Sequence, residues 1–422
     1  MSSIARPTRA HAEQLDATDS LAAFREEFGG IEPGLIYLDG NSLGRLPRAT
    51  ARRLAEVVDV EWREGLIRSW ESWIDLPTRV GDRIATTLLG ARRGEVVVSD
   101  STTVNLYKLA AAALDARPGA GTIVTAADEF PTDRYVLSGL AAARGLQVRV
   151  VAADEVTGPD VAQLRAALDE DVALVCLSHV GYRSGAMADL SAITAAAHEV
   201  GALVLWDLCH AVGSVPIGLT AAGADLAVGC TYKYLNGGPG APAFLYVRQE
   251  LQESLRQPVW GWFGQRDQFA MGADYDPQPD ARAFLTGTPP VLGLVAVEEG
   301  VRLLARAGLD RLRAKGMALT GLAVELTDAW LAPLGFEVAS PRDPAKRGSH
   351  LTLRHPEAEA ICRALTETAG VIGDFRAPDR LRLGPAPIHT RFTEVWDAFD
   401  RIRTLVAAGE HHEFAATTGK VN

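Results

Sequence analysis

The sequence contains few cysteines, only four in the whole chain. No two of them form a CxxC pair, and this argues against a structural zinc site. Scattered free thiols are usually small buried side chains, and they suit a reducing compartment. We therefore expect a cytoplasmic protein without a bound metal ion. The cysteines are Cys176, Cys209, Cys230 and Cys362.

Long apolar runs and an excess of basic residues are also missing. No apolar run approaches the roughly 20 residues that a membrane-spanning helix needs, and residues 1–6 lack the apolar core of an export signal. The chain has 42 Lys and Arg against 53 Asp and Glu, which gives a formal net charge of −11. Because nucleic-acid binding needs a basic surface, we expect neither a nucleic-acid partner nor a membrane.

A length of 422 residues allows a large core and more than one domain. The central part alternates apolar runs with helical patterns, which is typical of a mostly parallel sheet with helices on both faces. The runs 225–229 and 243–247 have no helix-length spacer, so one of them is expected to be antiparallel. The expected strands are 95–98, 122–125, 148–152, 173–177, 202–206, 225–229 and 243–247, and the helices between them are 104–114, 134–143, 161–168 and 190–200.

The pattern differs on either side of this α/β region. Residues 1–45 are expected to form an N-terminal arm that returns to a small C-terminal domain. Residues 46–290 form the expected large domain, which ends in a segment rich in glycine, proline and aromatic residues. Residues 291–422 form the expected small α+β domain. Helices are also expected near 21–28, 48–64, 292–307, 311–330, 357–368 and 393–407, and strands near 35–38, 335–339, 349–353 and 380–383.

Two strand ends carry the residues with the clearest chemistry. The run 202–206 ends in Asp207, and the next strand leads to Lys233, which precedes the glycine-rich turn 235–240. A carboxylate at a buried strand end is costly unless it is paired. The pyridinium nitrogen of pyridoxal phosphate would pair with it, while the lysine forms the Schiff base. The alternatives are a helix cap or structural ion pair for Asp207 and a surface position for Lys233.

A phosphate group would find contacts at the turn Ser101-Thr102-Thr103, between a strand and a helix. Hydroxyls and unpaired N–H groups at a helix N-terminus bind anions. The alternative is an ordinary N-cap. Tyr232, next to the lysine, is placed to reach the same phosphate.

The string Phe130-Pro131-Thr132-Asp133 follows another strand. We expect Phe130 to stack on the cofactor ring, and Thr132 and Asp133 to contact the ring edge. The alternative is that Thr132 and Asp133 cap the following helix. His210, three residues after Asp207, is expected to fix that carboxylate by a hydrogen bond.

A candidate carboxylate clamp lies on the strand near 380–383. The guanidinium of Arg382 can hold the α-carboxylate of an amino acid in bidentate fashion. Arg380 lies on the same strand face, since side chains alternate, so either arginine fits this role. An exposed salt bridge is the alternative.

Taken together, these strings resemble the kynureninase family of fold-type-I, class V aminotransferase-like pyridoxal-phosphate enzymes. The similarity runs from about Tyr37 to about Trp396. Its most specific strings are Asp39-Gly40-Asn41-Ser42-Leu43-Gly44 and Tyr232–Pro242. Further matching segments are Ser101–Asn105, Phe130–Asp133, Asp207–His210, Gly261–Gly264, Gly287–Pro290 and Arg382.

The resemblance implies a large domain with a seven-stranded sheet, pyridoxal 5'-phosphate as cofactor, and a homodimer with shared active sites. It implies a hydrolase of tryptophan catabolism that cleaves L-kynurenine, or its 3-hydroxy form, into the corresponding anthranilate and L-alanine. By position, Lys233, Asp207 and Tyr232 are expected to be catalytic. Expected cofactor contacts are Thr102, Thr103, Phe130, Pro131, Thr132, Asp133, Ser178, Asp207, His210, Tyr232 and Lys233.

The resemblance also assigns residues to the substrate and to the second subunit. Arg382 is expected to clamp the carboxylate, with Asn41 and Ser42 as further substrate contacts and Ser42 at the aromatic end. Trp262 and Thr288 are expected to reach the cofactor site from the second subunit. Thr288 stands where some relatives carry Asn, which leaves the preference for the substrate ring open.

Other activities of the same fold remain as alternatives. One is a related enzyme that acts on a substituted kynurenine in a biosynthetic pathway. An aminotransferase would need a keto-acid acceptor. A cysteine desulfurase would need a mobile nucleophilic cysteine near the small domain, where Cys362 is instead expected to be a buried helix residue. A non-catalytic regulator would need an added DNA-binding module.

Overall fold

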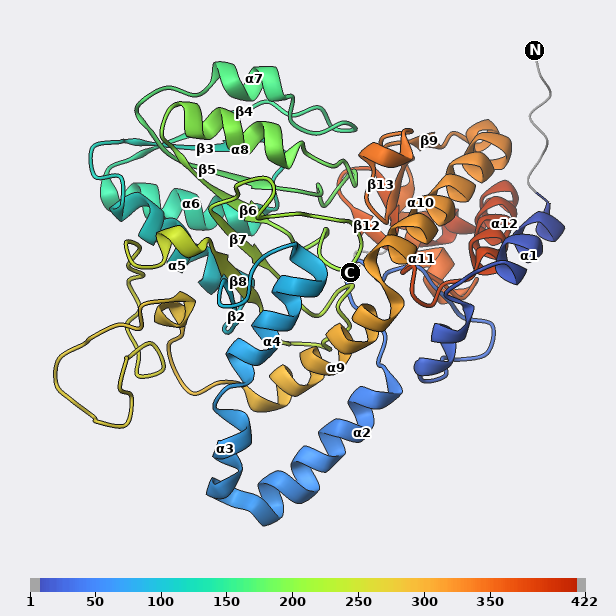
Figure 1. Cartoon of the computed structure of the whole chain (residues 1–422). Helices are drawn as coiled ribbons and strands as arrows, with labels where there is room; N and C mark the ends of the chain where they lie inside the picture. Colours follow the sequence, from blue (N-terminus) through green and yellow to red (C-terminus); the bar gives the residue numbers. More distant parts are fainter. Residues whose placement is uncertain (1–7, 416–422) are drawn as a thin grey trace.

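The computed structural model of the chain describes residues 8–415, so the expectation about an export signal in residues 1–6 lies outside it. A large α/β layer lies beside a smaller layer built from the C-terminal part of the chain (Figure 1). Within the described residues, no helix combines the length and the apolar character needed to cross a membrane.

The large layer is built on a seven-stranded sheet with the order β2-β8-β7-β6-β5-β3-β4. Strand β8 runs antiparallel to both of its neighbours, and the other pairs are parallel. The expected reversal after the run 225–229 is therefore confirmed. The strands are β2 (Val96–Val98), β3 (Thr122–Ala126), β4 (Gln147–Val151), β5 (Val172–Ser178), β6 (Leu203–Asp207), β7 (Leu226–Gly229) and β8 (Phe244–Val247).

Helices cover both faces of this sheet, because neighbouring strand residues point into two different cores. On β6, Trp206 packs into one core and Leu205 into the other; on β8, Phe244 and Leu245 divide in the same way. One core includes α4 (Leu76–Ile84), α7 (Val161–Ala166), α8 (Leu190–Glu199) and α9 (Val291–Ala307), and the other includes α5 (Thr102–Asp115) and α6 (Pro131–Arg144). The carboxyl ends of β5, β6 and β7 meet at one edge, where ligands bind in sheets of this kind.

The smaller layer is an antiparallel four-stranded sheet with the order β12-β13-β10-β9. Its strands are β9 (Glu337–Val338), β10 (Leu351–Arg354), β12 (Asp374–Arg376) and β13 (Arg380–Leu383), and its helices are α10 (Leu309–Leu326), α11 (Ala358–Glu367) and α12 (Phe392–Ala408). Near the chain start, β1 (Ile36–Tyr37) pairs in parallel with β11 (Val371–Ile372). The first strand of the chain thus joins the C-terminal part.

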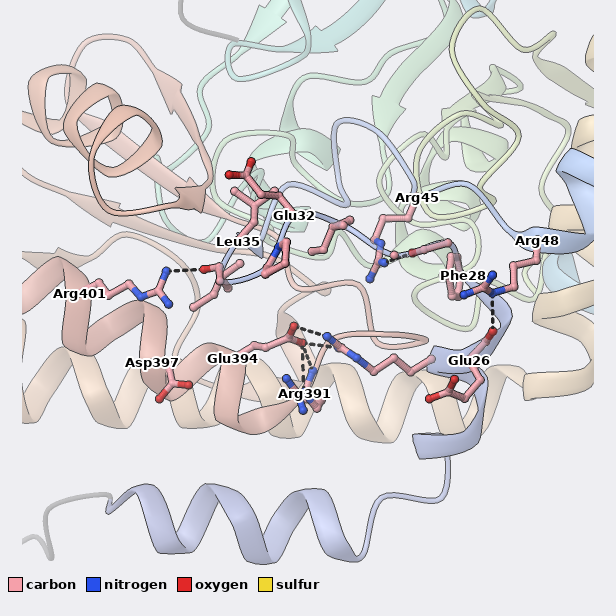
Figure 2. A pocket seen from close by; sticks show the side chains of 17 residues that line it. Glu26, Phe28, Glu32, Leu35, Arg45, Arg48, Arg391, Glu394, Asp397 and Arg401 are labelled. Atoms are coloured by element: carbon pink, nitrogen blue, oxygen red, sulfur yellow. Dashed lines mark hydrogen bonds and ion pairs between the residues drawn. The ribbon is translucent and has the colours of Figure 1, made fainter.

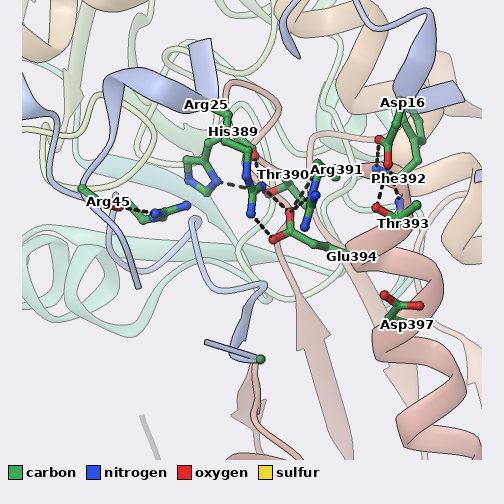
Figure 3. A network of polar contacts seen from close by, with 12 residues as sticks. Asp16, Arg25, Arg45, His389, Thr390, Arg391, Phe392, Thr393, Glu394 and Asp397 are labelled. Carbon is green, nitrogen blue, oxygen red and sulfur yellow. Dashed lines mark hydrogen bonds and ion pairs between the residues drawn. The ribbon is translucent and has the colours of Figure 1, made fainter. Parts of the chain in front are cut away.

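Polar contacts hold the N-terminal arm to the start of α12 (Figure 3). The Asp16 carboxylate accepts hydrogen bonds from the backbone N–H groups of Phe392 and Thr393 at 2.7 and 3.1 Å. A carboxylate is favoured there because the first turn of a helix carries unpaired donors and a positive dipole end. Arg25 forms a two-pronged ion pair with Glu394, at 2.5 and 2.6 Å.

Several elements differ from those expected. The arm contains a helix that was not predicted, α1 (Arg9–Ala17), whereas the helix expected near 21–28 is a 3₁₀ turn, Ala22–Glu27. Strands β11 and β12 were also missed, because they have only two and three residues, and β11 depends on a partner distant in sequence. The remaining segments are α2 (Arg48–Glu56), α3 (Trp70–Trp73), π-helical Val57–Gly65, Ala85–Leu89 and Thr327–Leu331, and 3₁₀ Leu66–Ser69, Gln249–Leu251, Ala281–Phe284, Ala332–Leu334, Pro344–Lys346 and Glu410–Phe414.

Candidate active site

Lys233 lies in a tight turn that follows β7. The turn closes through backbone hydrogen bonds from Asn236 N to Lys233 O and from Gly237 N to Thr231 O, both 2.9 Å long. Asn236 has a φ of +56°, a conformation that asparagine tolerates better than most residues. The Lys233 side chain is half-buried, and its Nζ lies 3.3 Å from Nε2 of His210. The turn therefore presents the amine at the carboxyl edge of the sheet.

The two strings most specific to the family resemblance touch each other. Gly44 N donates a 2.8 Å hydrogen bond to Tyr232 O. A Cβ at Gly44 would lie 2.3 Å from Lys233 O, so only glycine fits at this contact. At the other end of the same turn, Gly40 N donates to Gly384 O at 3.0 Å, next to strand β13. Residues 39–44 are thus held between the lysine turn and the small layer.

Asp207 ends β6 and is only 6% exposed. Its Oδ1 accepts a 2.6 Å hydrogen bond from Cys209 N. Asp133, on the first turn of α6, is also buried, and burial together with the nearby Asp207 charge raises the pKa of Asp133 well above its usual range. These surroundings favour the neutral form of the Asp133 carboxyl group. Phe130 occupies the N-cap of α6 without a side-chain cap, so the capping alternative does not describe Asp133.

Glu129 is a buried carboxyl group that the sequence patterns did not single out. It accepts hydrogen bonds from the backbone N–H and the hydroxyl of Ser178, at 3.0 and 2.5 Å. Burial raises the pKa of Glu129 to about 7. It thereby fixes Ser178, one of the expected cofactor contacts, at the end of β5. The sequence offered one signal that could have identified Glu129, which is its position directly before Phe130.

The start of α5 offers a phosphate-binding surface beside Asp207. Ser101 is the N-cap and accepts from Val104 N at 3.4 Å, so Thr102 and Thr103 form the first turn of the helix. The Thr102 hydroxyl lies 3.9 Å from Cys209 Sγ, two residues beyond Asp207. The cap alternative therefore holds for Ser101, while both threonines stand where an anion would meet the free helix donors.

Phe130 is well placed to cover a flat ligand. Its side chain is 39% exposed, which is unusual for a phenylalanine at the edge of a core. Its ring packs edge-to-face against Tyr182, with 5.3 Å between centroids and 87° between planes. This contact fixes the ring orientation. Pro131 and Thr132 follow in the first turn of α6 and are half-buried.

Arg382 rather than Arg380 lies beside the lysine. Its guanidinium, 1% exposed, contacts Oδ1 of Asp374 at 2.8 Å, the Ser42 hydroxyl at 3.0 Å and the Tyr182 carbonyl at 2.6 Å. Its Nη1 is also 3.4 Å from Nε2 of His210, the atom that faces Lys233. Arg380 instead pairs with Asp379 and Glu155, at 2.6 and 2.5 Å.

The other two expected substrate contacts lie on the turn 39–44. Ser42 donates a 2.9 Å hydrogen bond to Asp374, so it belongs to the group that holds Arg382. Asn41 is fully buried against Gly384, with neither of its amide atoms hydrogen-bonded within residues 8–415. Asp374, the anchor of the group, was missed from the sequence because its strand is too short to show a pattern.

His210 faces the lysine and the arginine. Within the described chain it makes no hydrogen bond to Asp207, in contrast to the expectation, because its imidazole turns toward the Lys233 turn. Burial and the neighbouring Lys233 and Arg382 charges lower the pKa of His210 well below its usual range, so the ring is neutral. His350, a second buried imidazole missed from the sequence, lies 5.6 Å away between ring centroids.

Trp262 and Thr288 lie apart from this group in the described chain. The Trp262 ring packs on Phe263 and Phe269, with centroid separations of 4.6 and 6.2 Å, and Thr288 is exposed. Neither makes a hydrogen bond or ring contact with Lys233 or Arg382 within residues 8–415. Their expected role across a subunit boundary stays a prediction.

A separate pocket of about 390 Å³ lies along the N-terminal arm (Figure 2). Several arginines line it, but they are engaged: Arg25 pairs with Glu394, and Arg401 donates to Gly34 O at 2.8 Å. Arg45 donates to Gly29 O at 2.6 Å. These contacts hold the arm in place, and the pocket is distinct from the lysine site.

The residues around Lys233 fit pyridoxal phosphate. The group combines an amine, a helix N-terminus for a phosphate, an exposed aromatic ring and a buried carboxyl pair. The Oδ2 atom of Asp133 is buried without a hydrogen-bond partner among the described residues, so the carboxyl pair has capacity for one more polar contact. A pyridinium N–H supplies such a contact.

Comparison with solved structures supports this architecture. The apo cysteine desulfurase of Thermococcus onnurineus NA1 has a TM-score of 0.77 and 20% identity, over 89% of this chain and 95% of that chain. A C-DES mutant with glycine covalently linked to its PLP cofactor has a TM-score of 0.75 and 17% identity, over 93% and 99% of the two chains. The predicted fold-type-I architecture is confirmed.

Sequence comparison identifies the family. A family model described as the kynureninase C-terminal domain matches residues 312–402. A kynureninase of Pseudomonas fluorescens is 47% identical over 399 residues, which cover 93% of this chain and 94% of the relative. The resemblance stated from the sequence is therefore confirmed, and the chain belongs to the kynureninase family of pyridoxal-phosphate enzymes.

Proposed function

We propose that this protein hydrolyses L-kynurenine between Cβ and Cγ, giving anthranilate and L-alanine. One observation carries the proposal. Lys233 Nζ lies 3.3 Å and Arg382 Nη1 lies 3.4 Å from the same atom, His210 Nε2. An α-amino acid presents an amine and a carboxylate on one carbon. A lysine amine and a guanidinium that meet at one imidazole match that pair of groups.

Pyridoxal phosphate, when bound, supplies an electron sink for the α-amino acid. Asp207 would pair with the pyridinium nitrogen, and its carboxylate would keep that nitrogen protonated. Thr102, Thr103 and Tyr232 would hold the phosphate. Phe130 would cover the ring face, while Ser178, fixed by Glu129, would contact its edge.

Lys233 is the proposed base for the substrate Cα proton. The neutral ring of His210 can accept a hydrogen bond from Nζ without adding a charge beside it. Arg382 would hold the carboxylate so that the Cα–H bond faces the amine. Water would add to the γ-carbonyl of the substrate, after which the Cβ–Cγ bond breaks. Tyr232, next to the lysine in sequence, is a candidate to carry protons between these atoms.

The family membership also suggests an assembly, a division into domains and a pathway for this chain. We propose a cytoplasmic homodimer in which Trp262 and Thr288 complete the partner's site. We also propose the division into an arm (1–45), a large domain (46–290) and a small domain (291–422), and a place in tryptophan catabolism. An enzyme for a ring-substituted kynurenine remains the second candidate, because Thr288 stands where some relatives carry Asn.

A steady-state comparison of three substrates tests the proposal. Purified protein with added cofactor is given L-kynurenine, 3-hydroxykynurenine and a halogenated kynurenine, and the released aminobenzoate is followed by its fluorescence. We expect the highest kcat/KM for L-kynurenine. A preference for the halogenated substrate would select the second candidate. A keto-acid requirement without aminobenzoate release would show an aminotransferase. Desulfurase activity is not expected, since Cys362 is buried in α11.

A further inference from the structure

A second cluster of potential ligands lies in the small layer and includes none of the residues around Lys233. Glu357 is the N-cap of α11, and His411 and His412 belong to the 3₁₀ segment Glu410–Phe414 that follows α12. This segment packs along α11 in the C-terminal, red part of the chain (Figure 1). The cluster therefore joins two elements that are more than 50 residues apart in sequence.

The three side chains converge with the spacing of a metal site. Glu357 Oε2 lies 3.2 Å from His411 Nε2, and Glu357 Oε1 lies 3.6 Å from His412 Nε2. One ligand atom from each residue can be chosen so that all lie within 4.8 Å of one another. Zinc–ligand bonds of about 2.0–2.1 Å in a tetrahedron place neighbouring ligand atoms roughly 3.3 Å apart. Small side-chain adjustments would meet this geometry.

Burial distinguishes the members of the cluster. The His411 side chain is only 3% exposed, whereas the His412 and Glu357 side chains are 63% and 42% exposed. The Nδ1 atom of His411 is buried without a hydrogen-bond partner within residues 8–415. The cluster thus has one buried imidazole, whose Nε2 faces Glu357, and two ligands open to solvent. An ion could enter from that side and keep a water molecule as fourth ligand.

The Glu357 carboxylate does not cap the helix that it precedes. It stands at the N-cap of α11, yet its side chain makes no capping hydrogen bond, and both oxygens face the imidazoles. His355 contributes in another way. Its Nδ1 accepts from Glu357 N, and its Nε2 lies 3.1 Å from Leu334 O, so both ring nitrogens are engaged. It supports the backbone of Glu357 and is not a ligand.

We propose that Glu357, His411 and His412 bind one divalent transition-metal ion of the zinc and cobalt class, with water completing the coordination. Two imidazoles and one carboxylate suit such ions better than magnesium or calcium, which prefer oxygen ligands. The ion would tie the segment Glu410–Phe414 to the start of α11. It would stabilise the small layer and leave the chemistry at Lys233 unchanged.

Zinc titration of the cofactor-loaded enzyme tests this proposal. Metal is first removed with a chelator, and Zn²⁺ binding is then measured by calorimetry near pH 7.5, together with the thermal midpoint. The variants are Glu357→Gln and His412→Ala, both at exposed side chains, so that folding is preserved. His11→Ala is the matched control, because it removes an exposed imidazole on α1 outside the cluster.

We expect one Zn²⁺ per chain in the wild type and in His11→Ala, with a raised thermal midpoint. Glu357→Gln and His412→Ala should bind at least about ten-fold more weakly, since loss of one ligand costs this much or more. Their turnover without metal should equal that of the wild type. Equal affinity in the wild type and both cluster variants, or no saturable binding of one ion, would overturn the proposal.

Discussion

The lysine site and the arm network differ in the partners of their ionisable groups. In the arm, Arg25 meets Glu394 in a two-pronged ion pair, and Asp16 meets the donors of a helix start. At the lysine site, burial displaces the pKa values of Asp133 and His210, and the Asp207 charge at Asp133 and the Lys233 and Arg382 charges at His210 add to these shifts. Displaced pKa values cluster at sites where protons move, and in the part of the chain that the structure describes the arm pairs contact none of the groups around Lys233. We therefore expect substitutions at the lysine site to change turnover and substitutions in the arm to change stability.

The largest effect is expected for Lys233→Ala. Turnover should fall by more than about 1,000-fold, because the amine is both covalent group and base. The half-exposed position predicts little change in folding. Anthranilate release, the yellow colour of bound cofactor and the thermal midpoint measure these effects. Lys346→Ala, at an exposed lysine outside the site, is the control and should keep full turnover. Normal turnover in Lys233→Ala would refute the assignment.

Arg382 and Arg380 provide the next comparison. Arg382→Lys should raise KM for kynurenine about 100-fold with little change in cofactor absorbance, because a bidentate, charge-assisted contact is worth about 2–3 kcal/mol. Arg380→Lys, which disturbs pairs with Asp379 and Glu155, should leave KM nearly unchanged. A larger KM effect at Arg380 would move the clamp to that residue.

Glu129→Gln tests the displaced protonation directly. Burial raises the pKa of Glu129 to about 7 from a usual value of 4.5, so the folded state holds a proton that the unfolded state releases between these values. The contribution of Glu129 to the free energy of unfolding should therefore fall as pH rises from 4.5 to 7, by up to about 3 kcal/mol. Denaturant unfolding of wild type and variant without cofactor, at pH 5 and pH 7.5, measures the difference. A pH-independent difference would contradict this.

Arg25→Ala should give the smallest effect and only on stability. Breaking its partly buried pair with Glu394 should lower the free energy of unfolding by about 1–2 kcal/mol. Turnover at saturating substrate should stay within about two-fold of wild type, since no proton at the lysine site depends on this pair. Parallel unfolding and activity measurements distinguish the two regions. A large loss of turnover in a stably folded Arg25→Ala variant would contradict the expected difference between the arm and the lysine site.

Local patterns predicted much of this molecule. The alternating apolar runs gave the seven strands and the reversal at β8, since buried strands leave a clear mark in the sequence. The strand predictions succeeded because the relevant residues are neighbours in the chain. The end of β6 at Asp207 was predicted in the same way, while the roles of Asp207 and Lys233 stay predictions.

Contacts between distant segments could not be read in this way. The anchor Asp374 meets Ser42 across 332 positions of sequence. The pairing of β1 with β11 spans a similar distance, and neither strand is long enough to show periodicity. Periodicity also left Arg380 and Arg382 equivalent, because only their partners distinguish two side chains on one strand face. The direction of His210 likewise depends on groups from three different elements.

The turn 39–44 is bonded at one end to Tyr232 O and at the other to Gly384 O. It therefore connects the Lys233 turn with the end of β13, the strand that carries Arg382. A chain shortened to begin after Gly44 would keep every strand of the large sheet and both charged groups. It would lose these two hydrogen bonds and the contacts of Ser42 with Arg382 and Asp374, so a segment far from the large sheet in sequence belongs to the architecture of the proposed substrate site.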